Sequence, residues 1–259
     1  MENIMKKSAL FLALSALATG SAFANSFVNG GFETGDLSGW TEGGGCWGGN
    51  NCGSNVFVPY TGGALPTAPQ YAGGNPNNVV MSGGTDPITG QNRVYNGAYS
   101  VRVNDSNNNY SVSTLTQSVT NYTDNDIYFQ WNAVLEASHG LTDSDYFSLT
   151  LKDDTTNSVL LTRSYSSASA PGTFTQFGNW YGSGWQLEHI DLVALGAVGH
   201  DFTLSLLASD CPYSGHAGYV YLDGFAPVII PPGVPEPATL ALLGLGLAGL
   251  GISRRRKFA

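Results

Sequence analysis

Short segments in which apolar and polar residues alternate recur along the middle of the chain. Residues 127–135 carry Ile, Phe, Trp, Ala and Leu at every second position, with Gln130 and Asn132 among the residues between them. The same alternation returns in residues 99–103, 147–152 and 202–206. A period of two indicates strands that turn one face to a core and the other to solvent.

Clusters of Gly, Asn, Asp and Ser separate these segments, and no convincing helical pattern occurs between residues 25 and 232. Ten or so antiparallel strands therefore predict an all-β fold, a two-sheet antiparallel jelly roll or β-sandwich. The region from Glu42 to Gln91 is rich in Gly, Asn and Pro and predicts long loops. Further candidate strands are Asn55–Tyr60, Asn78–Met81, Tyr110–Val119, Ser158–Tyr165, Gln186–Leu192 and Ala217–Phe225.

The two ends of the chain differ from this body. Lys6 and Lys7 precede an apolar run, and Ala22-Phe23-Ala24 forms a cleavage site, so residues 1–24 are predicted to be a signal peptide. Residues 238–252 carry no charge and would span roughly 22 Å as a helix. The predicted domains are the signal peptide, a sandwich at 25–230, and a tail at 231–259 with a short transmembrane helix.

The tail resembles the PEP-CTERM sorting signal of Gram-negative bacteria. A Pro-Glu-Pro triplet, an apolar run and a basic cluster follow one another in the order of that signal. The resemblance implies processing by an exosortase-type enzyme of an inner-membrane-anchored precursor, which then reaches the cell surface or is secreted. The alternative is an ordinary C-terminal anchor, whose basic residues would stay in the cytoplasm. The residues that carry the resemblance are Pro235, Glu236, Pro237, Arg254, Arg255 and Arg256.

Charge narrows the range of partners. The segment between the two signals keeps 4 basic and 17 acidic residues, a net charge of −13. Such a body is a poor partner for nucleic acid or for anionic lipid, and a good one for divalent cations.

The three cysteines are Cys46, Cys52 and Cys211, and export permits disulfides. Cys46 and Cys52 close a small loop rich in Gly and Asn and are the predicted pair. Cys211 could instead pair with either or stay a buried thiol, because sequence does not settle connectivity. No C-x-x-C spacing occurs, so zinc is not predicted.

The body carries a second resemblance. Residues 29–40, 96–103 and 219–225 resemble the opening, a middle strand and the closing strand of jelly-roll carbohydrate-binding modules. The resemblance implies a structural calcium ion held by Glu33, Asp223 and backbone carbonyls. Gly224 stands where the family often has a second Asp. The alternative is that both acids cap turns.

The search for catalytic motifs is negative: neither G-x-S-x-G nor H-E-x-x-H occurs. A facing carboxylate pair among the 17 acids stays open, although solvated loop acids are preferred. His189, His200 and His216 are predicted to be structural. The aromatic candidates for stacking against a sugar are Trp47, Trp180 and Trp185, with core packing as the alternative.

These patterns predict a non-catalytic exported protein of the cell surface or extracellular biofilm matrix, associated with polysaccharide. The alternatives are a structural matrix protein without a specific ligand, and a glycan hydrolase or lyase.

Overall fold

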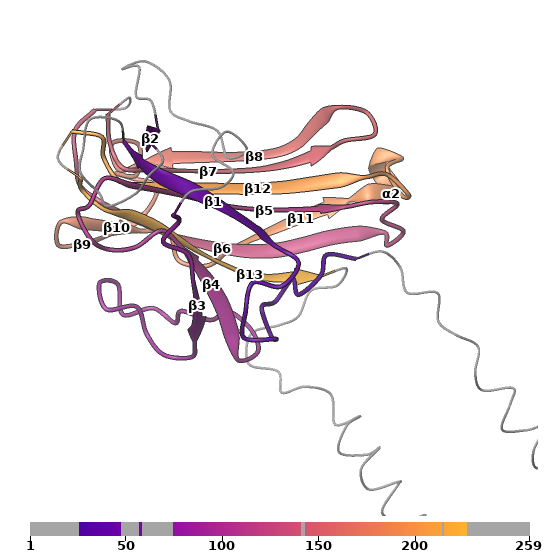
Figure 1. Ribbon diagram of the computed structural model, residues 1–259, viewed down its shortest axis with the longest axis horizontal. Helices are drawn as coiled ribbons and strands as arrows, with labels where there is room; N and C mark the ends of the chain where they lie inside the picture. Colours follow the sequence, from indigo (N-terminus) through magenta and orange to yellow (C-terminus); the bar gives the residue numbers. More distant parts are fainter. Residues whose placement is uncertain (1–25, 48–56, 59–74, 141–142, 214, 227–259) are drawn as a thin grey trace, which may run out of the picture.

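The body is a sandwich of two β-sheets (Figure 1). The computed structural model describes residues 26–47, 57–58, 75–140, 143–213 and 215–226. The predicted signal peptide, the Pro-Glu-Pro tail and its transmembrane helix lie outside these residues. Within them, no helix has the length and hydrophobicity needed to cross a membrane. The predicted two-sheet antiparallel architecture is confirmed.

The first sheet has six strands in the order β2-β1-β5-β12-β7-β8. Neighbours pair antiparallel, except β1 with β2, which are parallel. The strands are β1 (Thr41–Trp47), β2 (Phe57–Val58), β5 (Ser111–Val119), β7 (Tyr146–Asp153), β8 (Ser158–Ser166) and β12 (Phe202–Ser209).

The second sheet has seven strands in the order β3-β4-β13-β6-β10-β9, and β11 also pairs with β6. Their neighbours all pair antiparallel. The strands are β3 (Val79–Ser82), β4 (Tyr99–Val103), β6 (Asp126–Glu136), β9 (Thr175–Phe177), β10 (Trp180–Gly182), β11 (Gln186–Asp191) and β13 (Gly218–Ala226).

The core lies between the sheets and is built from the alternating positions seen in the sequence. Phe129, Trp131 and Leu135 of β6 are buried against Phe147 and Leu149 of β7 and their neighbours. The Trp131 and Phe147 rings lie 4.9 Å apart. Each large side chain removed from water stabilises the fold by about 1.5–3 kcal/mol, so this face holds the two sheets together.

Strand β1 lies where the sequence predicted a loop. Its three central residues are glycines, which have low strand propensity. At Gly44, a Cβ atom would lie 2.1 Å from the carbonyl oxygen of Val112, and φ is +150°. Glycine is required here because β1 passes too close to β5 for a side chain. The glycine-rich composition, which predicted a loop, instead allows β1 to pair closely with β5.

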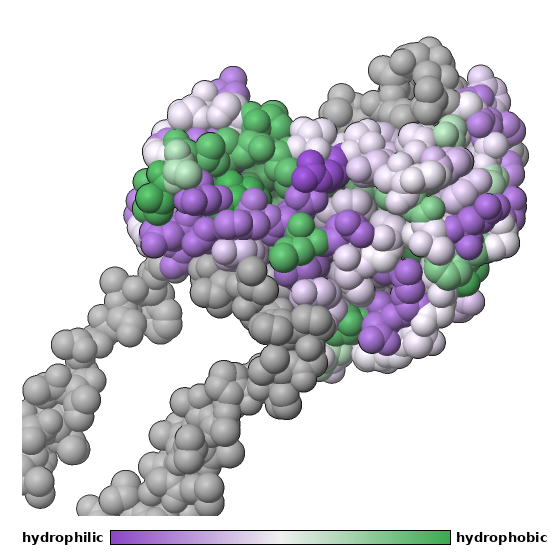
Figure 2. Space-filling view, turned by 180° about the vertical axis from the view of Figure 1, so that it is seen from behind, coloured by the Kyte–Doolittle hydropathy of each residue, from purple (hydrophilic) through white to green (hydrophobic). Residues whose placement is uncertain are grey.

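A single-turn helix, α2 (Leu192–Leu195), corrects the expectation of no helix. Asp191 caps its first turn by accepting a hydrogen bond from Ala194 N (2.8 Å). Gly196 ends it in the left-handed conformation. Val193 and Leu195 stay exposed, and Figure 2 shows hydrophobic residues gathered at the end of the body that carries α2.

An ion pair joins edge strands of the two sheets. Arg163 on β8 donates two hydrogen bonds of 2.7 Å to the Glu188 carboxylate on β11. Trp131 Nε1 donates to the same carboxylate (2.8 Å), so a side chain of the core and one of an edge strand share this acceptor. Glu188 is buried and Arg163 is partly exposed. A bidentate pair of this kind fixes how the two edges sit together.

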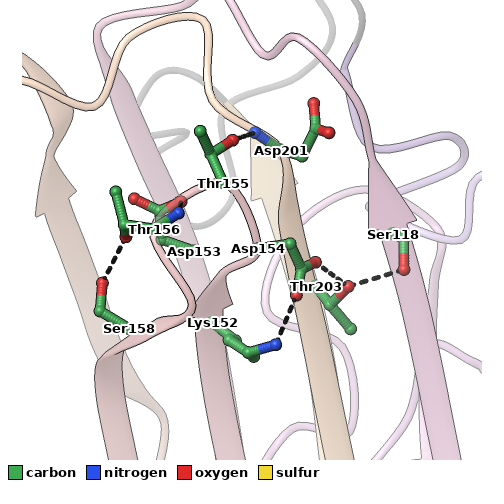
Figure 3. A network of polar contacts seen from close by, with 9 residues as sticks. All are labelled: Ser118, Lys152, Asp153, Asp154, Thr155, Thr156, Ser158, Asp201 and Thr203. Carbon is green, nitrogen blue, oxygen red and sulfur yellow. Dashed lines mark hydrogen bonds and ion pairs between the residues drawn. The ribbon is translucent and has the colours of Figure 1, made fainter.

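The β7–β8 turn is held by two adjacent acids with different surroundings (Figure 3). Asp153 is buried, accepts from Thr156 N (3.0 Å) and lies 2.8 Å from His200 Nδ1. Asp154 is exposed and contacts Lys152 and Thr203. Burial raises the pKa of Asp153, but the hydrogen bonds from His200 and Thr156 outweigh burial and hold that pKa below its usual value.

We expect Asp153→Asn to lower stability at neutral pH by about 1–2 kcal/mol, because hydrogen bonds to a buried charge are lost. Ionised Asp153 stabilises the fold above its unfolded pKa, near 3.8, and this contribution disappears as the pH falls through the lower folded pKa. Below about pH 5, the melting temperature of the variant should therefore fall less steeply with pH than that of the unmodified chain.

Melting curves by circular dichroism between neutral pH and pH 3 measure this difference. Asp154→Asn is the matched control, because an exposed ion pair contributes little. Equal acid profiles for Asp153→Asn and the unmodified chain would contradict the assignment.

Candidate functional site

The outer face of the second sheet carries a second cluster of aromatic residues. Strand β13 turns Val220 and Leu222 into the core, so the alternate residues Tyr219 and Tyr221 point outward. They pack with Val134 of β6, and further partly buried side chains lie against them. We call this group the aromatic face; its other members are Met81, Ile88, Trp180 and Trp185.

The loop of residues 83–95 covers part of the aromatic face through Asp86. Oδ2 of this buried carboxylate accepts hydrogen bonds of 2.8 Å from the hydroxyls of Tyr219 and Tyr221. Its other oxygen, Oδ1, accepts from Ile88 N, Thr89 N and Thr89 Oγ1. Burial, and then the charge of Asp86, raise the pKa of both phenols. Both tyrosines therefore remain protonated donors that fasten the loop.

Trp180 and Trp185 remain half-buried beside the covered tyrosines. The Trp180 ring lies 6.1 Å from that of Tyr219. Trp185 Nε1 donates to Asn92 O (2.9 Å), and its ring contacts Tyr95 edge-on at 5.7 Å. These contacts fix the orientation of two rings that keep part of their surface accessible to a ligand.

Amide side chains lie among these rings. Asn132 Nδ2 donates to Gln91 Oε1 (2.9 Å), which links β6 to the covering loop. Ser183 Oγ accepts from Ala133 N (2.8 Å) and lies 3.4 Å from Asn132 Oδ1. Rigid aromatic surface combined with a few oriented polar groups is the usual composition of a small-molecule site.

Trp47, the third aromatic candidate, does not face solvent. Its side chain is 1% exposed and packs with Val112, Tyr146 and Leu207. Its Nε1 donates to Asp210 O (2.6 Å). Trp47 therefore packs in a buried hydrophobic cluster, as the alternative to sugar stacking predicted. This cluster lies on the outer side of the first sheet, away from the core between the sheets.

Glu33 and Asp223 converge on the loop of residues 95–99. The Glu33 carboxylate accepts from Ala98 N (3.0 and 3.1 Å) and from Tyr99 N (3.2 Å). Asp223 Oδ2 accepts from Tyr95 N (2.8 Å) and from Asn96 N (3.0 Å). Both acids thus cap turns, as one of the two alternatives expected.

Asp223 is buried, whereas Glu33 is exposed. Burial raises the pKa of Asp223 to about 7, an effect to which the charge of Glu33 adds and which the backbone hydrogen bonds oppose. A Cβ built on Gly31 would lie 3.9 Å from Asp223 Oδ1 and 3.7 Å from Glu33 Cγ. Glu33 Oε2 and Asp223 Oδ1 each accept one hydrogen bond and keep a second lone pair, so one oxygen of each acid remains for a hard cation such as calcium.

Two acids that could form a catalytic pair are buried away from solvent. Asp145 and Asp210 are both 0% exposed, and burial raises the pKa of each. Asp145 accepts from Ser167 Oγ (2.5 Å). Asp210 accepts from Asn104 Nδ2 and Ser111 N. These buried carboxylates hold loops at the end of the sandwich through their hydrogen bonds.

The cysteines and histidines divide into distinct groups. Cys46 is disulfide-bonded, and Cys52, its predicted partner, lies outside the described residues. Cys211 is a buried free thiol. His189 and His200 pair with Asp126 and Asp153, as expected of structural histidines. His216, also predicted to be structural, lies beside His139 and Cys211. No short motif marks this group, because 72 residues separate His139 from Cys211.

Comparison with known families identifies the tail. Residues 233–257 match the PEP-CTERM protein-sorting motif. The chain carries this sorting signal. The match includes Pro235, Glu236, Pro237 and the basic cluster, so the predicted motif is confirmed. It implies an exported protein that is sorted and processed by an exosortase.

No curated protein matches the chain. Among solved structures, TmCBM61 in complex with β-1,4-galactotriose is similar at 13% identity and a TM-score of 0.38, over 78% of this chain and 95% of that one. CBM27-1 of Caldicellulosiruptor saccharolyticus, solved with mannohexaose, is similar at 10% identity and a TM-score of 0.37, over 78% and 97%.

A cellulose-specific module, CBM28, is similar at 12% identity and a TM-score of 0.36, over 77% of this chain and 93% of that one. The body is thus distantly similar to carbohydrate-binding modules.

We expect Asp86→Ala to destabilise the body by about 3 kcal/mol, because two buried hydroxyls and two backbone amides lose their acceptor. Tyr219→Phe, which keeps the ring and removes one hydroxyl, should cost about 1 kcal/mol. Urea unfolding followed by fluorescence measures both values. Equal costs would show that Asp86 does not hold the loop.

Proposed function

We propose that the chain is a non-catalytic exported protein whose body associates with polysaccharide at the cell surface or in the extracellular matrix. The sorting motif supplies the route of export. The observation that carries the binding role is the pair of half-buried, oriented rings of Trp180 and Trp185 on the aromatic face.

Sugars present apolar C–H surfaces that pack on aromatic rings, while amide and hydroxyl groups pair with sugar hydroxyls. Trp185 is held by Asn92 O and by Tyr95, so little freedom is lost when a ligand binds. Gln91, which is partly exposed and held by the buried Asn132, supplies a polar side chain beside Gly184 and Trp185. The aromatic face therefore provides both kinds of contact on one sheet.

The charge of the exported part, −13, influences which glycan can bind. An acidic polysaccharide would be repelled unless divalent cations bridge the two surfaces. A neutral glycan carries no such cost. We therefore propose a neutral polysaccharide as the primary ligand class.

A second function is favoured by the covering loop. Asp86 fastens residues 83–95 over Tyr219 and Tyr221, which removes both phenols from solvent. If the remaining rings bind nothing, the body serves as a structural matrix component held by multiplicity and cation bridging.

We also propose that Glu33 and Asp223 hold a structural calcium ion. Two like charges near one loop repel one another, and a divalent cation offsets that repulsion. Calcium would join the opening segment to β13 and thereby stabilise the body without taking part in chemistry.

Replacing both rings, in Trp180→Ala/Trp185→Ala, should weaken retention on neutral glycans by at least about tenfold, because stacking on two aromatic rings is lost. Affinity electrophoresis through gels that contain galactan, mannan or cellulose derivatives measures retention. Leu187→Ala, another exposed apolar side chain on the second sheet, is the control. Retention of the double variant equal to that of the control would favour the structural alternative.

Calcium in excess should raise the melting temperature of the full chain, because a ligand that binds only the folded state stabilises it. Glu33→Gln should abolish this rise, whereas Asp36→Asn, in the same opening segment, should keep it. Differential scanning calorimetry with calcium or chelator gives the comparison. A calcium effect that survives in Glu33→Gln would place the ion elsewhere, and no effect in the unmodified chain would leave both acids as turn caps.

A further inference from the structure

Three potential metal ligands meet at the end of the sandwich where β6 and β12 finish and β13 begins. His139 lies three residues beyond β6, Cys211 two residues beyond β12, and His216 two residues before β13. Backbone hydrogen bonds fix this convergence: Glu136 N donates to Ala217 O (3.0 Å), and Cys211 N donates to His216 O (2.8 Å). The cluster therefore rests on the ends of core strands from both sheets.

The donor atoms of the three side chains all lie within 4.8 Å of one another. In a tetrahedral zinc site, bonds of about 2.0–2.3 Å place neighbouring ligand atoms roughly 3.3–3.7 Å apart. The 4.8 Å limit exceeds that spacing by about 1 Å, a difference that rotations of the ligand side chains would have to close.

We propose that His139, Cys211 and His216 form a binding site for a borderline-soft transition-metal ion of the zinc class. Two imidazoles and one thiolate are the donor set that zinc and its chemical neighbours prefer, whereas calcium and magnesium prefer oxygen. Three protein ligands leave a fourth position for water or another donor.

A backbone N–H donor points at the sulfur of Cys211. Its side chain is fully buried, and Sγ lies 3.4 Å from Tyr213 N, which donates to the sulfur. As a thiol, Sγ donates to Asp143 O (3.0 Å). Metal binding would release this proton to solvent, replace the S–H bond with an S–metal bond and keep the Tyr213 N–H donor.

The second histidine has a partner of the kind that orients metal ligands. Ser138 Oγ lies 3.2 Å from His216 Nδ1 and holds the ring from that side. Ligating imidazoles are commonly fixed in this way through their other nitrogen. His216 is half-buried and His139 is exposed, so the ion would enter from the His139 side.

The competing explanation is a packing cluster without metal. The His139 ring lies 5.2 Å from that of His216 and 6.0 Å from that of Tyr213, both nearly perpendicular. Such contacts could fill the loop end by themselves. Without a metal, the Cys211 thiol donates to Asp143 O and accepts from Tyr213 N, whereas the metal site requires its sulfur to bind the ion. The two explanations therefore differ in what Cys211 does.

Cobalt titration of the full chain tests the proposal. Metal-free protein with the Cys46 disulfide intact and without a histidine tag is titrated with Co²⁺, which reports a thiolate ligand through a sulfur-to-cobalt charge-transfer band. We expect one ion per chain, the band, and its loss when Zn²⁺ displaces the cobalt. Calcium should leave the band unchanged.

Four variants separate the outcomes. Cys211→Ser should lose the band, and His139→Ala, an exposed position that leaves the core intact, should weaken binding by at least about 100-fold. His189→Gln and Asp36→Asn should bind cobalt as the unmodified chain does. Absence of saturable binding in the unmodified chain, or equal affinity in His139→Ala, would overturn the metal site and favour the packing cluster.

Discussion

The burial of alternate side chains between two sheets is the constraint on which the rest of the structure depends. Because a strand alternates its faces, fixing Trp131 and Leu135 inward fixes Asn132 and Val134 outward. The pairing of β6 with β13 then sets Tyr219 opposite Val134. The aromatic face is thus a consequence of the core, since a shift of one residue would exchange the two faces.

Much of this fold is predictable from sequence because its central strands obey a period of two. Residues 99–103, 127–135 and 202–206 alternate clearly, and all three lie in strands of the sandwich. Strand β1 was missed because its pairing depends on the absence of side chains. The need for glycine at position 44 can be recognised only once Val112 O is known to lie next to it.

The candidate sites were less predictable, because a residue type does not report its burial. Trp47 and Trp185 are both tryptophans in glycine-rich surroundings, yet one is buried and the other partly accessible. His139, Cys211 and His216 meet through strand ends distant in the chain, so their grouping depends on sheet register. Glu33 and Asp223 were placed together by resemblance, and the shared 95–99 loop gives that grouping a physical basis.

The opening and closing segments of the body lie side by side. Phe225 N donates to Gly30 O (3.2 Å), and the rings of Phe27 and Phe225 lie 4.4 Å apart. Strand β13 leads from the histidine–cysteine cluster to this point and spans nine residues, or about 30 Å. The histidine–cysteine cluster therefore lies at the opposite end of β13 from residue 226, the last described residue before the tail. Removal of the tail would leave the three residues of the cluster untouched, because they lie at the other end of that strand.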